Sequence, residues 1–379
     1  MSDVDFVAKS DALHGRVQAF ARGQGDDEFE ALALEIAQFQ ARNIPAYARL
    51  LEARGSTLSS FADIVAVPTD AFRLARVAVH PKAMDQTCFV SSGTSSAARS
   101  VHPMRRLDTY QDLAVRFATE KLVDDPHSRR VVVALAPHPG SPPTSSLGCM
   151  MRALMVALDG RALSVDPDGA LFNPDSLERW LVSNQGLNFA GLERAARMAL
   201  ERQEPLLILG TSLALVNLLD ALDGRTLRCP RTTTVMQTGG TKGRKLRSTA
   251  PDIAQGVARA LGIGVERVVS EYGMTELGSQ AYSDNLRTGT NTTAFTPSPC
   301  LRITPVDPVR LRPVPDGEPG LARFVDLCNV DSAVCVLTQD LVVRTDQGVE
   351  LLGRRPGAPA RGCSLDLEDL ILHRSAPQS

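Results

Sequence analysis

A hydroxyl and a carboxylate close the stretch Ser270–Glu276, which reads Ser-Glu-Tyr-Gly-Met-Thr-Glu. The valine-rich residues before it, Val265–Val269, predict a buried strand, and the glycine that follows predicts a sharp turn. Ligands of open α/β sheets bind at the carboxyl ends of strands. We therefore expect Thr275 to donate to a phosphate oxygen and Glu276 to hold Mg²⁺. An ordinary strand and turn with one exposed acid is the alternative for this stretch alone.

A second cluster of hydroxyl groups follows the expected strand Thr87–Val90. It consists of Ser91, Ser92, Gly93, Thr94, Ser95 and Ser96. Backbone N–H groups and hydroxyls in such a loop can surround phosphate oxygens. The loop lacks the Gly-Lys-Ser/Thr ending of a Walker A loop. A serine-rich surface turn is the alternative explanation.

Glycines and basic residues follow a further expected strand, Thr233–Met236. Gly239 and Gly240 carry no side chain, so the backbone can approach a nucleotide base closely. Lys242 and Lys245, two of the chain's few lysines, favour a ligand role for this loop. A flexible turn before the next helix is the alternative.

Asp340 stands in Thr338-Gln339-Asp340, within a region of short Val- and Leu-rich segments broken by Pro and Gly. We expect it at the end of a strand, where its carboxylate can accept hydrogen bonds from both hydroxyls of a ribose. The following Gly353–Gly357 is expected to be a linker, because it combines glycine, arginine and proline.

The elements that must position these residues follow an α/β pattern. Residues 1–85 are predicted to be the helical N-terminal segment of a large domain. Residues 86–299 alternate apolar strands with helices and form its α/β core. Residues 300–352 predict a β-rich subdomain, and residues 353–379 a short tail.

The bulk composition excludes several classes of protein. The chain has 379 residues, 43% hydrophobic and 22% charged, with a formal net charge of −2, so no nucleic-acid or anionic-membrane field is indicated. Its seven Cys form no C-x-x-C pair and it has six His, which argues for free thiols in a reducing cytosol rather than a zinc or disulfide framework. No apolar run approaches the ~20 residues of a membrane span, and no signal segment opens the chain. We expect a cytoplasmic protein.

The order of the motifs resembles that of the adenylate-forming superfamily of acyl-CoA synthetases, peptide-synthetase adenylation domains and firefly luciferase. The order is a Ser/Thr/Gly loop, a Gly-Gly loop, Tyr-Gly-x-Thr-Glu, Thr-x-Asp and Gly-Arg. Within that superfamily the chain is most similar to the acyl-protein synthetase family of bacterial bioluminescence. The resemblance implies an α/β large domain with a small C-terminal β-rich subdomain. The mobile C-terminal domain usual in the superfamily is expected to be truncated or absent, because little follows Gly353 and none of it is lysine.

The resemblance also implies binding of ATP and Mg²⁺ and assigns roles to residues. Residues Ser91 to Ser96 would bind phosphates, and Gly239, Gly240 and Thr241 would border adenine. The nucleotide would contact Glu271, Tyr272, Gly273, Met274 and Thr275, with Tyr272 near the base and Thr275 at the α-phosphate. Glu276 would hold the metal, and Asp340, with Arg354 beside it, the ribose. Lys242 or Lys245 would replace the lysine of the missing domain.

The activity implied is formation of an acyl-AMP from a carboxylic acid, in particular a fatty acid, with release of pyrophosphate. In the family the acyl group then passes to a Cys near the C-terminus, which Cys363 matches, and on to an acyl reductase. Direct transfer to CoA or a carrier protein is one alternative. A non-catalytic adenylate-binding scaffold is another. A serine hydrolase ranks last, because G-x-S-x-G fails at Ala214.

Overall fold

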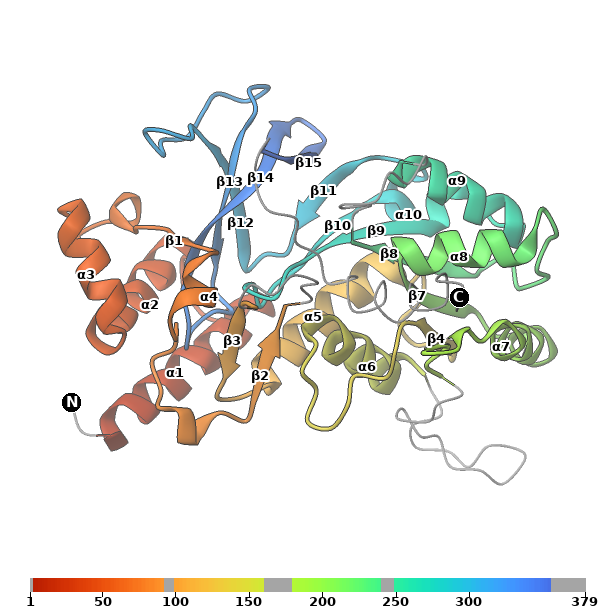
Figure 1. Cartoon of the computed structure of the whole chain (residues 1–379), viewed down its shortest axis with the longest axis horizontal. Helices are drawn as coiled ribbons and strands as arrows, with labels where there is room; N and C mark the ends of the chain where they lie inside the picture. The colour runs from red at the N-terminus through yellow and green to blue at the C-terminus, as the bar shows by residue number, and fades with distance from the viewer. Residues whose placement is uncertain (1–2, 92–98, 160–178, 240–248, 356–379) are drawn as a thin grey trace, which may run out of the picture.

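A mixed β-sheet with helices on both faces forms the body of the molecule, and a bundle of helices lies at one end of it (Figure 1). The computed structural model describes residues 3–91, 99–159, 179–239 and 249–355. This architecture confirms the predicted α/β class.

Helices dominate the N-terminal segment, as its sequence predicts. They are α1 (Asp3–Ala21), α2 (Phe29–Asn43), α3 (Pro45–Arg54) and α4 (Ala71–Leu74), with a short strand β1 (Val67–Pro68) and 3-10 turns η1 (Phe61–Asp63) and η2 (Lys82–Met84). Leu32, Ile36 and Phe39 are buried along one side of α2, at the spacing of an amphipathic helix. The apolar side of this helix therefore packs on the body of the protein.

Parallel strands form the part of the sheet that carries the candidate loops. They are β4 (Val131–Leu135), β7 (Leu206–Thr211), β8 (Thr234–Thr238) and β9 (Val268–Tyr272). The helices around them are α5 (Asp108–Leu122), α6 (Ser146–Leu158), α7 (Phe189–Arg202), α8 (Ser212–Leu222) and α9 (Ala250–Leu261). Because α5 and α6 cover one face and α7, α8 and α9 the other, β4, β7 and β8 are buried along their whole length. Burial on both faces explains the apolar sequence of β4 and of the first four residues of β7.

The sheet continues beyond β9 through antiparallel strands, in the order β9-β10-β11-β15-β14-β13-β12. These are β10 (Ala281–Ser283), β11 (Ala294–Pro297), β12 (Leu301–Val306), β13 (Gly320–Asp326), β14 (Cys335–Thr345) and β15 (Gly348–Arg354), with the short helix α10 (Asn285–Thr288) after β10. β1 pairs in parallel with β14. Strands on both sides of residue 300 thus belong to one sheet, and the division of the chain into units stays a prediction.

Two small hairpins lie off the main sheet. They are β2 (Thr87–Val90) with β3 (Val101–Met104), and β5 (Val182–Ser183) with β6 (Gly186–Leu187). The first confirms the strand expected before the serine loop. Within the described ranges, no helix combines the length and apolarity that a membrane crossing requires.

Four sequence-based boundaries are wrong. The strand expected at Thr233–Met236 is β8, Thr234–Thr238, because Gln237 and Thr238 still pair with β9. The strand expected at Val265–Val269 is β9, Val268–Tyr272, because Val268 is the first residue opposite a partner on β8, and Val265–Arg267 forms a 3-10 turn. Asp340 lies inside β14 rather than at its end, since β15 pairs with it there. Gly353 and Arg354 belong to β15 and not to a linker. In each case the neighbouring strand determines where the strand ends.

A buried polar cluster attaches α1 to the body of the protein. The Asp331 carboxylate, 7% exposed, accepts hydrogen bonds from the Ser10 hydroxyl, from His14 Nε2 at 3.1 Å and from Arg105 Nε at 2.9 Å. Burial opposes its ionisation, but the hydrogen bond from His14 and the charges of His14 and Arg105 hold the pKa of Asp331 below its usual range. The other ring nitrogen of His14 contacts Thr109 Oγ1 at 2.9 Å. One carboxylate therefore joins three elements.

We expect Asp331→Ala to lower the free energy of unfolding by about 3–5 kcal/mol, because it leaves the Arg105 charge and the His14 donor buried without this partner. Urea denaturation measures the change. Asp316→Ala is the matched control, since that carboxylate is 72% exposed and 3.8 Å from Arg344, and we expect it to cost less than about 1 kcal/mol. Equal losses in the two variants would contradict a structural role for the cluster.

Candidate functional site

Tyr272 is the last residue of β9 and points at a carboxylate on β14. Its hydroxyl donates to Asp340 Oδ2 at 2.8 Å. Its ring stacks on Phe324 with centroids 5.7 Å apart and planes at 8°, and Phe295 approaches edge-on at 5.9 Å. Burial, together with the Asp340 charge, holds the pKa of Tyr272 well above its ordinary value. The phenol therefore stays protonated and keeps donating to Asp340.

Asp340 is held from three sides. It faces Arg354 in the β14–β15 pair, and Arg354 Nε lies 3.4 Å from Asp340 Oδ1. Its own backbone N–H donates to Thr338 Oγ1 at 3.1 Å. The carboxylate is 6% exposed, so its orientation is fixed by these neighbours rather than by solvent. The structure thus brings together Asp340, Arg354 and Tyr272, which the sequence assigns to ribose and base.

Thr275 and Glu276 lie in a turn just beyond β9, in which Leu277 N–H donates to Met274 O at 3.1 Å. Both residues are buried, 3% and 4% exposed. The Thr275 carbonyl accepts from His102 Nδ1 at 2.7 Å, and the Glu276 carbonyl accepts from Asn329 Nδ2 at 2.9 Å. The turn is thus fixed by hydrogen bonds from two other elements.

His102 was not predicted from the sequence and lies on β3. Burial lowers its pKa to about 4, so the ring is neutral at physiological pH. Because its partner is a carbonyl, Nδ1 must carry the ring proton. A lone histidine inside an apolar strand gives no sequence signal for such a role, since its partner is remote in the chain.

Ser91 begins the serine loop where β2 ends. Its backbone N–H donates to Ser100 O at 3.0 Å, and its hydroxyl accepts from Ser100 N–H at 2.9 Å. His102 lies two residues after Ser100, on β3, and binds the Thr275 carbonyl, so the start of the loop and the Thr275 turn lie on neighbouring segments. Ser92, Gly93, Thr94, Ser95 and Ser96 fall outside the described residues.

Gly239 follows β8 and is adjacent to the end of β9, because Thr238 pairs with Glu271 in the parallel register. It has a φ of 75°, a conformation that favours glycine. Its carbonyl accepts from the Ser212 hydroxyl at 2.5 Å. The other predicted residues of this loop and the C-terminal thiol, namely Gly240, Thr241, Lys242, Lys245 and Cys363, fall outside the described residues.

The Glu271 side chain is buried against β8, on the parallel side of the sheet, whereas Thr275 and Glu276 lie in the turn beyond β9. The Thr238 hydroxyl donates to its Oε2, and burial raises the pKa of Glu271 to about 7. A Cβ added to Gly273 would lie 2.6 Å from Glu271 Oε1. Gly273 has no positive φ, so this close approach, rather than the expected sharp turn, explains the glycine.

The donor set suits a nucleotide and a hard cation. An aromatic ring, a carboxylate and a guanidinium lie together at Tyr272, Asp340 and Arg354, and these groups are chemically able to contact a nucleoside. Over the described part of the chain, no group of three or more His, Cys, Asp or Glu is arranged to hold a metal. Mg²⁺ in proteins usually binds through one or two carboxylates together with substrate phosphates and water.

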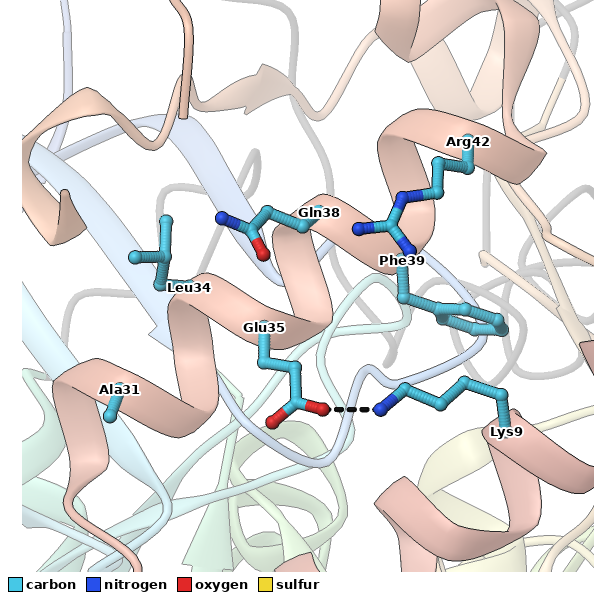
Figure 2. Close-up of a pocket in the computed structure, with 7 residues that line it drawn as sticks. All are labelled: Lys9, Ala31, Leu34, Glu35, Gln38, Phe39 and Arg42. Carbon is cyan, nitrogen blue, oxygen red and sulfur yellow. Dashed lines mark hydrogen bonds and ion pairs between the residues drawn. The ribbon is translucent and has the colours of Figure 1, made fainter. Parts of the chain in front are cut away.

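A separate cavity of about 400 Å³ lies between α1 and α2 (Figure 2). Its lining includes the Lys9–Glu35 ion pair, Gln38 and Arg42. None of the site residues predicted from the sequence lines it. The cavity and the candidate site are thus different features of the molecule.

The chain is similar to known proteins over most of its length. A family model described as "Acyl-protein synthetase, LuxE" matches residues 56–371. A structure of 2-hydroxyisobutyryl-CoA ligase in an open conformation, with 2-HIB-AMP and CoA, has 16% identity and a TM-score of 0.58, covering 85% of this chain and 73% of that one. The same ligase in its postadenylation state with 2-HIB-AMP has 15% identity and a TM-score of 0.58, covering 92% and 68%. These structures show the fold alone. No curated protein matches the chain.

We expect Glu271→Gln to change how stability depends on pH. The pKa of Glu in an unfolded chain is about 4.3. Because the pKa of Glu271 in the folded protein is about 7, the folded state keeps a proton there that the unfolded state has already lost. The stability that this proton contributes is present below the unfolded pKa and is lost as the pH rises through the folded one. Gln stays neutral at every pH. The difference in unfolding free energy between the variant and wild type should therefore shift in favour of the variant by on the order of 3 kcal/mol between low pH and a pH above 7.

Urea denaturation across this pH range measures the difference. Glu318→Gln, at an exposed position, is the control and should leave the pH profile of wild type unchanged. A Glu271→Gln profile parallel to that of wild type would show that Glu271 ionises normally in the folded protein.

Proposed function

The chain belongs to the acyl-protein synthetase (LuxE) family, and on this basis we propose that it activates a carboxylic acid with ATP and passes the acyl group to a thiol. The family and the fold support an ATP-dependent ligase of the acid–thiol kind. The observation that carries the proposal is the meeting of Tyr272, Asp340 and Arg354 beside the buried turn of Thr275 and Glu276.

The first step joins the acid to AMP. A carboxylate oxygen attacks the α-phosphorus of ATP, the bond from that phosphorus to the bridging oxygen breaks, and pyrophosphate leaves. No general base is needed, because the acid is already ionised. The protein's task is to position two anions and disperse charge. Thr275 and Ser91–Ser96 supply donors for the phosphates, and Asp340 accepts from the ribose.

Glu276 is the residue proposed to hold Mg²⁺. When bound, the cation would neutralise phosphate charge. The hydrogen bond from Asn329 to the Glu276 carbonyl fixes the backbone that carries this carboxylate. Lys242 or Lys245 is proposed to supply the additional positive charge that the superfamily takes from its C-terminal lysine.

The second step transfers the acyl group. The thiolate of Cys363 attacks the acyl carbonyl, the carbon–oxygen bond to AMP breaks, and AMP leaves. We further propose a fatty acid as the substrate, the cytosol as the location, and an acyl reductase as the final acceptor. A second candidate is direct transfer to CoA or a carrier protein, favoured by the CoA bound to the structurally similar ligase.

We expect ATP–pyrophosphate exchange to depend on a carboxylic acid, tested with straight-chain acids from octanoate to octadecanoate. Asp340→Asn should raise KM for ATP about tenfold, because it weakens an acceptor of the ribose. Thr275→Val should lower kcat by about 10–100-fold, because a phosphate donor is lost. Lys242→Ala or Lys245→Ala should lower kcat, according to which lysine supplies the missing charge. A variant with wild-type kcat excludes the lysine that it replaces.

Asp316→Asn, at an exposed site, is the control for these variants. If none of the acids supports ATP–pyrophosphate exchange, the chain is not a ligase of this kind, and a scaffold that binds adenylates becomes the better explanation.

We expect labelled acid and ATP to leave label on denatured wild type but not on Cys363→Ser, because Ser is a far weaker nucleophile than thiolate. Cys88→Ser is the matched control, since burial and the neighbouring Asp85 raise the pKa of Cys88, and its label should persist. Label that appears on added CoA, with none on the protein, would favour direct transfer.

A further inference from the structure

The segment that follows Glu276 is attached to the turn between β13 and β14. Asp326 ends β13 and is fully buried, with 0% exposure. Its Oδ2 accepts from Gly278 N–H at 2.8 Å and Ser279 N–H at 2.9 Å. Its Oδ1 accepts from the Ser279 hydroxyl at 2.6 Å and Cys328 N–H at 3.0 Å. One carboxylate thus binds both its own turn and the segment beyond the site.

Asn329, in the same turn, holds the site more directly. Its Nδ2 donates to Glu276 O at 2.9 Å and to Ala333 O at 2.9 Å. The side chain is buried, with the residue 3% exposed. Since an amide nitrogen has two donors, both are used, and the Glu276 carbonyl is tied to the far end of the β13–β14 turn.

Packing between the two segments is tight at Gly278. A Cβ added there would lie 2.7 Å from Cys328 Sγ, 2.8 Å from Cys328 Cβ and 3.2 Å from Asn329 Oδ1. Glycine is therefore required for the backbone to reach Asp326. A side chain at position 278 would displace this segment and lengthen its hydrogen bonds to Asp326.

The opposite side of the site turn is held by β3, where His102 donates to Thr275 O. Two consecutive carbonyls, of Thr275 and Glu276, are thus fixed by elements distant in sequence. Their side chains are the two groups assigned to phosphate and metal. Fixing the backbone between them fixes the Cα positions from which the hydroxyl and the carboxylate extend.

We propose that Asp326 and Asn329 are positioning residues for the adenylation step, which hold the Thr275 hydroxyl and the Glu276 carboxylate in place without contacting the substrate. The inference rests on the proposed function and adds residues that the motifs do not include. Misplacing a reacting group by about 1 Å can cost on the order of 100-fold in rate. Positioning therefore predicts a loss of kcat beyond any loss of stability.

Asn329→Asp tests the proposal with little change in size, because Asp cannot donate to Glu276 O. In Asp326→Asn an NH₂ group replaces one carboxylate oxygen, so two of the four groups that donate to Asp326 lose their acceptor. The control is Asn285→Asp, since Asn285 is 1% exposed and its Nδ2 donates to Val268 O at 2.8 Å, away from the turn. All three variants replace one buried hydrogen-bonding group by its isostere.

ATP–pyrophosphate exchange with the fatty acid preferred by wild type gives kcat and KM for each variant. We expect Asn329→Asp and Asp326→Asn to lower kcat at least about tenfold with KM for ATP within about threefold. Hydrogen exchange of the amides at 276–279 should accelerate in both. Asn285→Asp should match their loss in urea stability, yet keep kcat within about twofold of wild type.

A folded Asn329→Asp with faster amide exchange and wild-type kcat would overturn the positioning role. So would an equal loss of kcat in Asn285→Asp, because that would reflect stability alone. If wild type binds no adenine nucleotide and exchanges with no acid, the proposed function itself fails, which is a different result.

Gly278→Ala supplies the test if the Asp326 variant does not fold. Its new methyl group would press on Cys328 and should lower kcat similarly. Adding Cys328→Gly removes both closest atoms and should restore kcat at least in part. A Gly278→Ala variant with wild-type kcat would contradict the proposal.

Discussion

The pairing of β9 on both of its edges is the constraint on which the site depends. β9 lies parallel to β8 on one side and antiparallel to β10 on the other, so it is the boundary between two kinds of sheet. Gly239 comes to it from the parallel side. Through the antiparallel strands the chain returns Asp340 to the hydroxyl of Tyr272. Residues separated widely in sequence therefore meet at the carboxyl end of one strand.

Two buried carboxylates, Asp331 and Asp326, fix segments that have no regular secondary structure. Asp331, in the β13–β14 turn, binds α1 and the segment that follows β3, where charged and polar partners outweigh the cost of burial. Asp326 accepts only from N–H and O–H groups in the same turn and the segment after the site. Both belong to one connection, so this turn links the N-terminal helices and the site turn to the same sheet.

The two residues that close the site motif are presented by their backbone as much as by their side chains. His102 and Asn329 bind the carbonyls of Thr275 and Glu276 from opposite directions. This arrangement suits a reaction in which the protein must hold charged groups rather than transfer protons. It also explains how a short turn can remain ordered while Thr275 and Glu276 are both buried.

The sequence by itself determined the α/β class, the helical character of the N-terminal segment, and the strands before the serine and glycine loops, because these depend on local periodicity and turn residues. It also identified the family, because the motifs occur in a fixed order. Only the tertiary structure decided that β9 ends at Tyr272, that Asp340 lies inside a strand, and that Arg354 faces it, since partner strands set those limits. Only the structure revealed His102, Asp326 and Asn329. Their side chains bind backbone groups far away in the chain, and such bonds leave no local sequence pattern.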